Sequence, residues 1–198
     1  MTSMLLTGCF GGMEVNDRAF VQLMGLDRRD GIYYVTLQIY KSESGTADPD
    51  LSKANSITVP GKGAAIKDAL AEAELSVGKR LFLGHIKLII IGDGIKAPDL
   101  SIFVDSSVSP ACPVAYSEDP AAVAGVLFEE GAFSAEQLLR LMDINAERGK
   151  TIYTSIAAVV SAAEGCSVPL PCINAEEDTV VFDGITFIGE ETDVPPPA

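Results

Sequence analysis

Imidazole and thiol side chains, which often serve as general base and nucleophile, are few in this chain. His85 is its one histidine, so any catalytic pair that uses an imidazole must include it. Cys112 is the thiol that could partner it, but Pro110 and Pro113 flank this cysteine, where an activated thiol would often lie at a helix N-terminus. The sequence therefore predicts no catalytic pair. It predicts that His85 is a structural residue, held by backbone hydrogen bonds at the start of an apolar strand.

The cysteines and acidic residues also lack the spacing of a metal site. The four cysteines, at positions 9, 112, 166 and 172, show no C-x-x-C pattern. Without Cys9 an odd number remains, which argues against a complete disulfide framework. Cys166 and Cys172 are close enough to close a small loop, and the alternative is that all three are small buried apolar residues. Acidic clusters at 48–50 and 176–178 lack the alternating ligands of a calcium loop, and we interpret them as turns.

A glycine-rich segment at 61–66, Gly-Lys-Gly-Ala-Ala-Ile, lies where a strand should lead into a helix. A dinucleotide-binding fingerprint would need glycine at position 66 and an acid about 20 residues further on, and a P-loop would need Gly-Lys-Ser/Thr. Neither pattern is present, so we interpret 61–66 as a tight strand-to-helix turn. We expect no cofactor, no metal ion and no enzymatic activity.

Composition excludes further classes of partner. Lys and Arg total 14 against 28 acidic residues, which gives a formal net charge of −14. Such a surface is repelled by nucleic acid and by anionic lipid headgroups. With 198 residues, 47% of them apolar, the chain can bury the core of one domain. No run reaches the roughly 18 apolar residues that a spanning helix needs. Any attachment to a membrane must come from another source.

Cys9 is a candidate for that attachment. Residues 6–9, Leu-Thr-Gly-Cys, match the cleavage site of a bacterial lipoprotein, in which small residues precede the cysteine that receives the lipid. The apolar stretch before it is short and contains no basic residue, unlike a complete secretory signal. We therefore expect residues 1–9 to be the remnant of a lipoprotein signal, with lipidation at Cys9. The alternative is a chance Leu-Thr-Gly-Cys in a loop.

The pattern of apolar residues predicts an α/β (α+β) domain with a mixed, mainly antiparallel central sheet flanked by helices. An Asp-Gly turn within 27–31 should join the first two strands as an antiparallel hairpin. The most apolar segment, 81–91, should be one central strand buried on both faces. The predicted strands are 19–27, 31–41, 56–59, 81–91, 112–117, 169–175 and 179–188.

Helix signals fall mainly between these strands. Periodic apolar residues predict helices at 64–77 and 151–164, and a short helix lies near 100–104. Residues 42–55 should form a loop, and the Pro-rich residues 191–198 an extended tail. Further helix boundaries are marked by Asp119 with Pro120 and Ser134 with Gln137 at starts, and by Gly131 and Gly165 at ends.

Three segments, in order along the chain, resemble one family. Residues 9–17, Cys-Phe-Gly-Gly-Met-Glu-Val-Asn-Asp, with Gly25-Leu26-Asp27 and the paired strand 33–39 after them, look like the opening of the C subunit of spore germinant receptors. The segment 80–87 is similar to the family's aromatic-Gly-His-x-Lys stretch. The third match is the closing pair of strands, with Val-Pro-Leu-Pro at 168–171 and Val-Phe-Asp-Gly-Ile-Thr-Phe-Ile-Gly at 181–189.

The resemblance implies a lipid-anchored protein at the outer face of the inner spore membrane, whose N-terminal domain spans 10–190. It implies membrane-embedded A and B subunits as partners, contact with them as the mode of action, and no catalysis. The family residues carried over, beside lipidated Cys9, are structural or interface positions: Glu14, Asn16, Asp17, Gly25, Asp27, Gly84, His85 and Lys87.

The chain also departs from the family. Phe-Gly-Gly at 10–12 replaces the usual Trp and Arg, and Ser-Ser-Val-Ser stands at 106–109 where the family tends to have an Arg-Asp pair. Family members continue into further domains, so we expect a truncated or divergent member. Two other functions stay open, a lipoprotein that binds an amino acid or sugar directly and a cytosolic enzyme. A deep pocket with convergent polar groups would favour the solute-binding protein, and an apolar patch would favour protein contact.

Overall fold

The computed structural model describes residues 17–40, 56–104, 106–126, 134–162, 166–177 and 179–189. Strands and helices are mixed along the chain, which confirms the predicted α+β class. The elements are β1 (Arg18–Arg29), β2 (Ile32–Tyr40), β3 (Ser56–Gly63), α1 (Ile66–Val77), β4 (Arg80–Phe82), η3 (Leu83–His85), β5 (Leu88–Ile91), η4 (Ala97–Phe103), β6 (Val114–Tyr116), α2 (Pro120–Gly125), α3 (Ser134–Glu147), α4 (Ile156–Val160), β7 (Val168–Glu176) and β8 (Thr179–Ile188).

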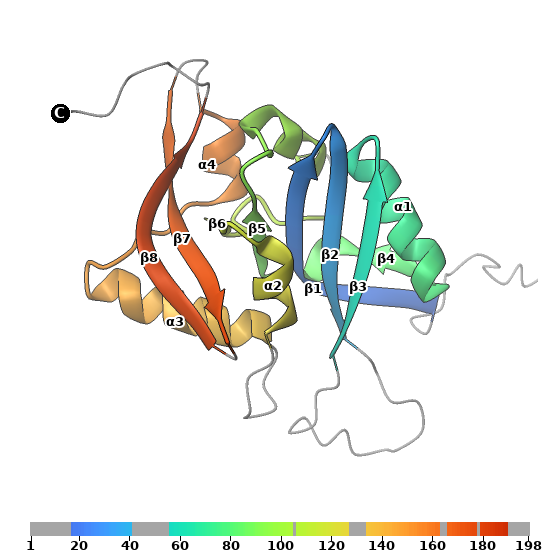
Figure 1. The fold of residues 1–198 in the computed structure, drawn as a ribbon, viewed down its shortest axis with the longest axis horizontal. Helices are drawn as coiled ribbons and strands as arrows, with labels where there is room; N and C mark the ends of the chain where they lie inside the picture. Colours follow the sequence, from blue (N-terminus) through green and yellow to red (C-terminus); the bar gives the residue numbers. More distant parts are fainter. Residues whose placement is uncertain are drawn as a thin grey trace, which may run out of the picture.

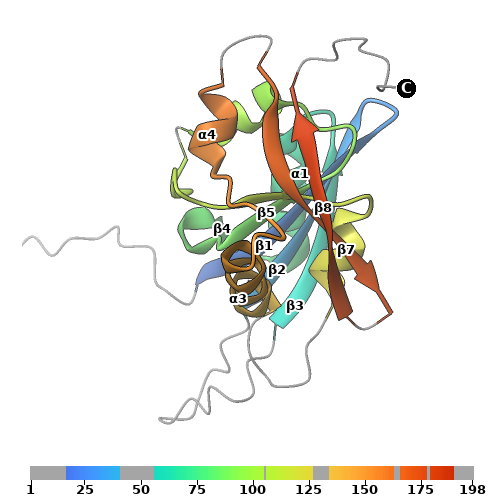
Figure 2. The same cartoon turned by 90° about the vertical axis from the view of Figure 1, so that its left-hand side faces the viewer.

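One mixed sheet organises these elements (Figure 1). Its order is β3-β2-β1-β5-β6-β7-β8, and β4 pairs with β1 beside this path. The long pairings at both ends, β1 with β2, β2 with β3 and β7 with β8, are antiparallel, while the short central strands pair in parallel. Turned by 90°, β7 and β8 lie in front of the central strands and at an angle to them (Figure 2). Such an angle is the expected twist of a large sheet.

The sheet has a core on each face, and β5 contributes to both. Ile89 and Ile91 belong to the core that contains α1, η4 and α4, whereas Leu88 and Ile90 belong to the core under α2 and α3. All four side chains are buried, because alternate residues of a strand point to opposite faces. This confirms the prediction of a strand buried on both faces.

The prediction of one continuous strand over 81–91 is wrong. Both β4 and β5 pair with β1 in parallel. Between the paired positions Phe20–Phe82 and Leu23–Leu88, β1 has two residues whereas the other segment has five. The surplus forms the 3₁₀ turn η3. The register of β1 against β2 shifts at the same place, between Val21 and Leu23. A bulge in β1 therefore explains why the apolar segment is interrupted.

The predicted helix at 151–164 is also too long, because α4 covers only Ile156–Val160. Residues before it are used in pairing: Val114 donates its backbone N–H to the Thr154 carbonyl at 2.8 Å, and Thr154 Oγ1 donates to the Pro169 carbonyl at 2.6 Å. Ser155 then caps the helix by accepting from the Ala158 N–H. β-Branched residues such as Thr154 favour extended backbone, so local propensity and tertiary pairing agree here.

Other local signals are confirmed. Asp30 and Gly31 have φ values of 52° and 78°, which a tight two-residue hairpin requires. Asp119 Oδ1 accepts from the backbone N–H groups of Ala121 and Ala122, as an N-cap should. The helix signal at 134 leads into α3. The remaining signals lie outside the described residues: the loop 42–55, the capping side chain of Ser134, Gly131, Gly165 and the tail 191–198.

Within the described residues, none of the helices combines the length and the apolar character needed to cross a bilayer.

Candidate functional site

His85 does not have the surroundings that the sequence predicts. It is exposed on the turn η3, and its ring packs edge-on with Phe20 and tilted against Phe82, both at 5.4 Å between centroids. The two phenylalanine rings are themselves perpendicular neighbours at 5.6 Å. Gly84 supports this cluster, since a Cβ on it would lie 3.0 Å from the Phe82 ring. The predicted backbone hydrogen bonds are replaced by aromatic packing.

The Cys112 thiol lacks the surroundings of a reactive cysteine. Its side chain is buried, and its Sγ lies 3.6 Å from the Pro113 carbonyl oxygen. Burial raises the pKa of this thiol to about 12, the opposite of what a nucleophilic cysteine needs. No contact joins Cys112 to His85 among the described residues.

The three cysteines in the described part of the chain form no disulfide. Cys112, Cys166 and Cys172 are all free, so the loop closure between Cys166 and Cys172 that the sequence allowed is absent. The interpretation as buried apolar residues holds for Cys112 and Cys172, but Cys166 is exposed. In the part of the chain that the structure describes, no three His, Cys, Asp or Glu side chains gather as a metal site would require.

The described family residues lie at two ends of β1 and do not form one site. Gly25 packs against α2, because a Cβ there would lie 2.8 Å from the Pro120 carbonyl oxygen. Asp27 accepts hydrogen bonds from the Arg28 N–H and the Arg29 side chain. From Phe20, which His85 contacts, to Asp27 is a rise of about 23 Å along a strand.

Lys87 and Asp17 are two further family positions that the structure describes. The backbone N–H of Lys87 donates to the Gln22 carbonyl at 2.8 Å, while the residue itself is exposed. Asp17 is exposed just before β1. Cys9, Glu14 and Asn16 lie outside the described residues, so their roles remain predictions.

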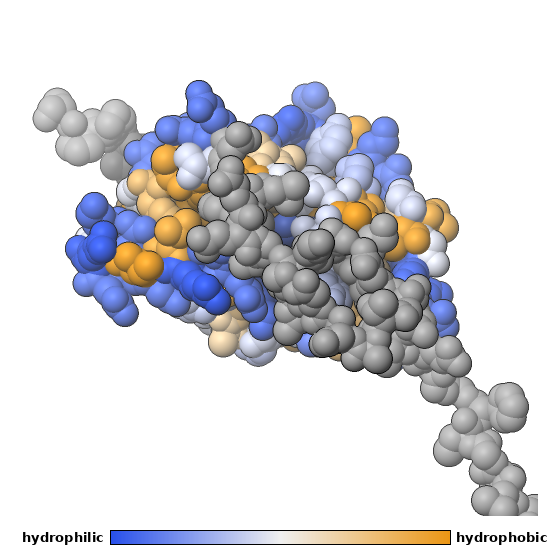
Figure 3. Space-filling view, turned by 90° about the horizontal axis from the view of Figure 1, so that it is seen from below, coloured by the Kyte–Doolittle hydropathy of each residue, from blue (hydrophilic) through white to orange (hydrophobic). Residues whose placement is uncertain are grey.

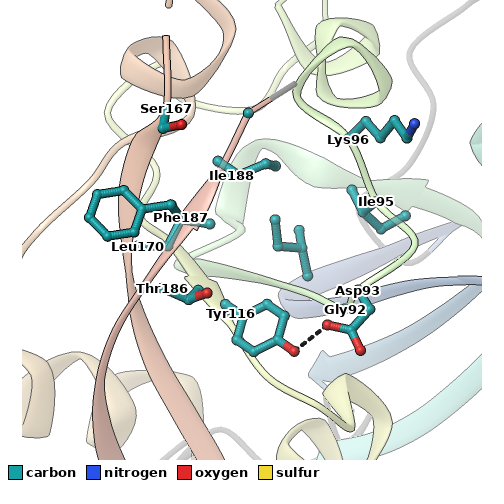
Figure 4. A pocket seen from close by; sticks show the side chains of 12 residues that line it. Gly92, Asp93, Ile95, Lys96, Tyr116, Ser167, Leu170, Thr186, Phe187 and Ile188 are labelled. Atoms are coloured by element: carbon teal, nitrogen blue, oxygen red, sulfur yellow. Dashed lines mark hydrogen bonds between the residues drawn. The ribbon is translucent and has the colours of Figure 1, made fainter. Parts of the chain in front are cut away.

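A cleft of about 410 Å³ lies at the carboxyl ends of the parallel strands β5 and β6 (Figure 4). In open α/β sheets ligands commonly bind at this position. Asp93, two residues after β5, accepts a hydrogen bond from the Tyr116 hydroxyl at the end of β6. Desolvation raises the pKa of Tyr116, and the hydrogen bond to Asp93 raises it further, so the phenol stays protonated. The cleft is lined by Ile91, Gly92, Asp93, Ile95, Lys96, Tyr116, Ser167, Leu170, Thr186, Phe187, Ile188 and Gly189.

The cleft presents polar groups of both charges. Asp93 and Lys96 are exposed and carry opposite charges, and hydroxyls of Ser167 and Thr186 face them across the space. The sequence indicates only that a strand ends at 92–94. One signal for the cleft was present in the sequence, because Asp93 closely follows the most apolar strand. The opposite wall of the cleft comes from β7 and β8, which lie far away in the sequence.

The hairpin of β7 and β8 presents an exposed apolar pair. Phe187 is 65% exposed and Ile185 is 45% exposed. In Figure 4 the Phe187 ring lies across the β8 ribbon from Ile188, which is buried. Sequence reasoning missed this pair because both residues belong to a strongly apolar strand whose inward face it could not assign.

The comparisons with known proteins agree with the resemblance in the sequence. A family model described as the spore germination protein N-terminal domain matches residues 11–173. Searches of curated proteins and of solved structures found no match. The matched range covers all the strands up to β7 and both ends of β1, where the family residues lie.

Proposed function

Because the chain belongs to the spore germination protein N-terminal domain family, we propose that it is a non-catalytic subunit of a nutrient germinant receptor that acts through contact with its partners. The family places the protein in spore germination. The partners we propose are the membrane-embedded A and B subunits of the receptor.

The exposed pair of Ile185 and Phe187 is the observation that carries this proposal. Large apolar side chains that stay exposed together on one strand favour a contact surface for another protein. The chemistry of the described residues points the same way, because the thiol of Cys112 is buried with a raised pKa and His85 packs against phenylalanines.

A lipid on Cys9 is the proposed means of membrane attachment. Acyl chains contribute about 0.8 kcal/mol per buried methylene, and two or more chains give stable anchoring without basic residues. This fits a chain with a net charge of −14, which anionic headgroups would repel. The domain would then work close to the outer face of the inner spore membrane.

Acyl labelling tests the anchor. The protein is expressed in a sporulating host behind a complete lipoprotein leader, as wild type, Cys9→Ala and Cys166→Ser. We expect fatty-acid label and membrane fractionation for the wild type and for Cys166→Ser, whose exposed thiol serves as the matched control. Cys9→Ala should lose both. Equal labelling of Cys9→Ala would refute the anchor.

Co-purification tests the contact. The tagged chain is co-expressed with the A and B subunits, and the detergent-solubilised membranes are analysed for retained subunits. Retention of both subunits by the wild type is the expected result. If the chain purifies alone at every detergent concentration that keeps A and B together, the proposed mode of action is wrong.

A second function, direct binding of a small solute, is favoured by the cleft at Asp93 and Tyr116. A zwitterion such as an amino acid could place its ammonium at Asp93 and its carboxylate at Lys96. Calorimetric titration with amino acids and sugars tests this, with Asp93→Asn as the variant that removes the negative charge. Saturable heat that is lost in Asp93→Asn would support solute binding, and no heat with any ligand would dismiss it.

A further inference from the structure

The two edges of the sheet differ in how they are protected. β3 forms one edge, and α1 packs closely against it: a Cβ on Gly61 would lie 2.2 Å from the Ala69 carbonyl oxygen. Pro60 lacks an N–H, and the N–H of Lys62 donates to Glu72 at 2.6 Å. These are the usual ways in which an edge strand is kept from pairing with another chain.

β8 forms the other edge and has none of these devices. It is 10 residues long, contains no proline or lysine, and among the described strands pairs only with β7. A long edge strand leaves one row of its main-chain N–H and C=O groups without a neighbouring strand. Such a row is the template on which an extended peptide can add a further strand.

A bulge determines which side chains border this edge. Asp183 and Gly184 both lie opposite Cys172, and Gly184 has a φ of 79°. Before the bulge, Phe182 packs in the core with α2 and α3; after it, Ile188 packs in the core on the opposite face. The extra residue therefore reverses the alternation and leaves Ile185 and Phe187 outside both cores.

Ile185 and Phe187 lie beside a small apolar floor. Their partners across the strand pair are Pro171 and Pro169. This apolar surface has no helix over it in the described residues, because α3 packs against the other half of the hairpin, at Val180 and Phe182. Figure 3 views the molecule from below, on the side of α3, and shows apolar residues beside strongly hydrophilic ones at its left; Ile185 and Phe187 lie toward the other end of β8.

Charge restricts what could pair with β8. After Lys150 the chain contains no Lys, Arg or His, and its acids are Glu164, Glu176, Glu177, Asp178, Asp183, Glu190, Glu191 and Asp193. Two β8 strands from two copies would bring like charges together, which is unfavourable. Residues 190–198 carry three of these acids and three prolines, so this segment does not complement the strand either.

We propose that the edge of β8 from Ile185 to Ile188 pairs with an extended segment of a partner protein in which Lys or Arg alternates with apolar residues. The apolar side chains pack on Ile185 and Phe187, and the cations pair with Asp183, which lies two residues before Ile185 in the same strand. Main-chain hydrogen bonds supply affinity, and the alternating side chains supply specificity. This inference rests on the proposed function, and it adds the surface and the chemistry of the partner.

A peptide titration tests the pairing directly. The 198-residue chain is titrated with a fluorescent, end-capped peptide of about seven residues that alternates lysine and valine, and with the same peptide carrying glutamate for lysine. We expect saturable binding of the lysine peptide, weakened by salt, and no binding of the glutamate peptide. Equal binding of both peptides, or of neither, would overturn the inference.

Matched variants separate pairing at β8 from general attraction to an acidic protein. Phe187→Lys and Leu75→Lys change the net charge equally, but Leu75 is an 84% exposed residue on α1. Phe187→Lys should weaken binding of the lysine peptide about tenfold or more, while Leu75→Lys should change it little. Equal weakening by both variants would mean that the peptide senses only net charge, and the inference would fail.

Cross-linking in the assembled receptor distinguishes this inference from the function on which it rests. A photoreactive phenylalanine analogue replaces Phe187 or Leu75 in the chain co-expressed with the A and B subunits. Cross-links from position 187 to a basic, extended segment support the inference. Co-purification without any cross-link from 187, or a cross-link to a second copy of this chain, rejects it while the proposed function stands. Absence of co-purification rejects the proposed function itself.

Discussion

The two edge strands of the sheet, β3 and β8, differ in whether another element packs against them. At β3, Gly61 and Gly63 let α1 approach the strand, so that backbone and helix close that side of the molecule. At β8, Gly184 serves a bulge that turns Ile185 and Phe187 outwards. Glycine is used at both edges, in one case to bury a strand and in the other to expose side chains. In our proposal one edge of the sheet therefore serves stability and the other serves contact with a partner.

The largest effect should come from filling the space between β3 and α1. Gly61→Ala places a methyl group 2.2 Å from the Ala69 carbonyl oxygen, so helix and strand must separate. We expect a loss of about 3 kcal/mol in the free energy of unfolding, measured by urea titration. Gly125→Ala is the control, because a Cβ there meets nothing within 4 Å. Equal stability of the two variants would mean that the β3 edge is not tightly closed.

The next effect concerns how the β7–β8 hairpin is joined to the centre. β6 and β7 share one registered pair, Tyr116 with Cys172, and the Asn174 Oδ1 accepts from the Ser117 hydroxyl and the Glu118 N–H, both at 3.2 Å. Asn174→Ala should cost about 2 kcal/mol by leaving these donors without their acceptor.

Hydrogen exchange locates that loss. Amides of β7 and β8 should exchange faster in Asn174→Ala, while those of β1 to β3 should keep their protection. Asn145→Ala is the matched control, since the Asn145 side chain donates within α3, to the Leu141 carbonyl. Uniformly faster exchange across the whole sheet would contradict a separately attached hairpin.

A smaller effect is expected at the bulge. Gly184→Ala must hold alanine at a φ of 79° and should cost about 1 kcal/mol. Gly78→Ala, at a φ of 68° at the end of α1, should cost a similar amount. Only the change at Gly184 should also weaken the lysine peptide, because only it disturbs Ile185 and Phe187. Unchanged binding of the lysine peptide by Gly184→Ala would mean that the bulge does not shape the contact surface.

The smallest effect near neutral pH concerns the thiols. The contribution of Cys112 to stability changes only in alkali. The pKa of Cys112 is raised by burial to about 12, so its thiol contributes stability that is complete below its usual value near 9 and is lost as the pH rises from about 9 to 12. At pH 8, in a Cys9→Ala background, a thiol reagent should modify exposed Cys166 quickly and Cys112 only after unfolding. Rapid modification of Cys112 in the folded protein would show that the core around Cys112 becomes accessible to solvent as readily as the β7–β8 hairpin.

The sequence predicts best where the structure is decided by neighbouring residues. Asp30-Gly31 makes the first hairpin, and Asp119 with Pro120 begins α2, as predicted. Prediction fails where distant strands compete for the backbone. The 3₁₀ turn at Leu83–His85 arises from the register of β4 and β5 against a bulged β1, and residues before α4 are held extended by β6 and β7.

The candidate site was harder to predict than the fold. The family residues could be read from the order of motifs, but Gly25 and Asp27 lie far along β1 from His85, so they form no single site. The cleft joins Asp93 and Tyr116 to residues about 50 to 95 positions further along the chain, at Ser167 and Ile188. Such combinations cannot be read from local patterns.

The amino-acid sequence by itself determined the class of fold, the family, the excess of negative charge and the lack of a catalytic motif, because each depends on residue types, their order or short-range periodicity. The tertiary structure alone decided which edge of the sheet is closed and which apolar residues remain outside. The reason is that exposure depends on packing. Ile185 and Phe187 belong to the same apolar strand as buried Ile188. The bulge in β8 and the position of α3 decide which of these side chains are buried and which stay exposed.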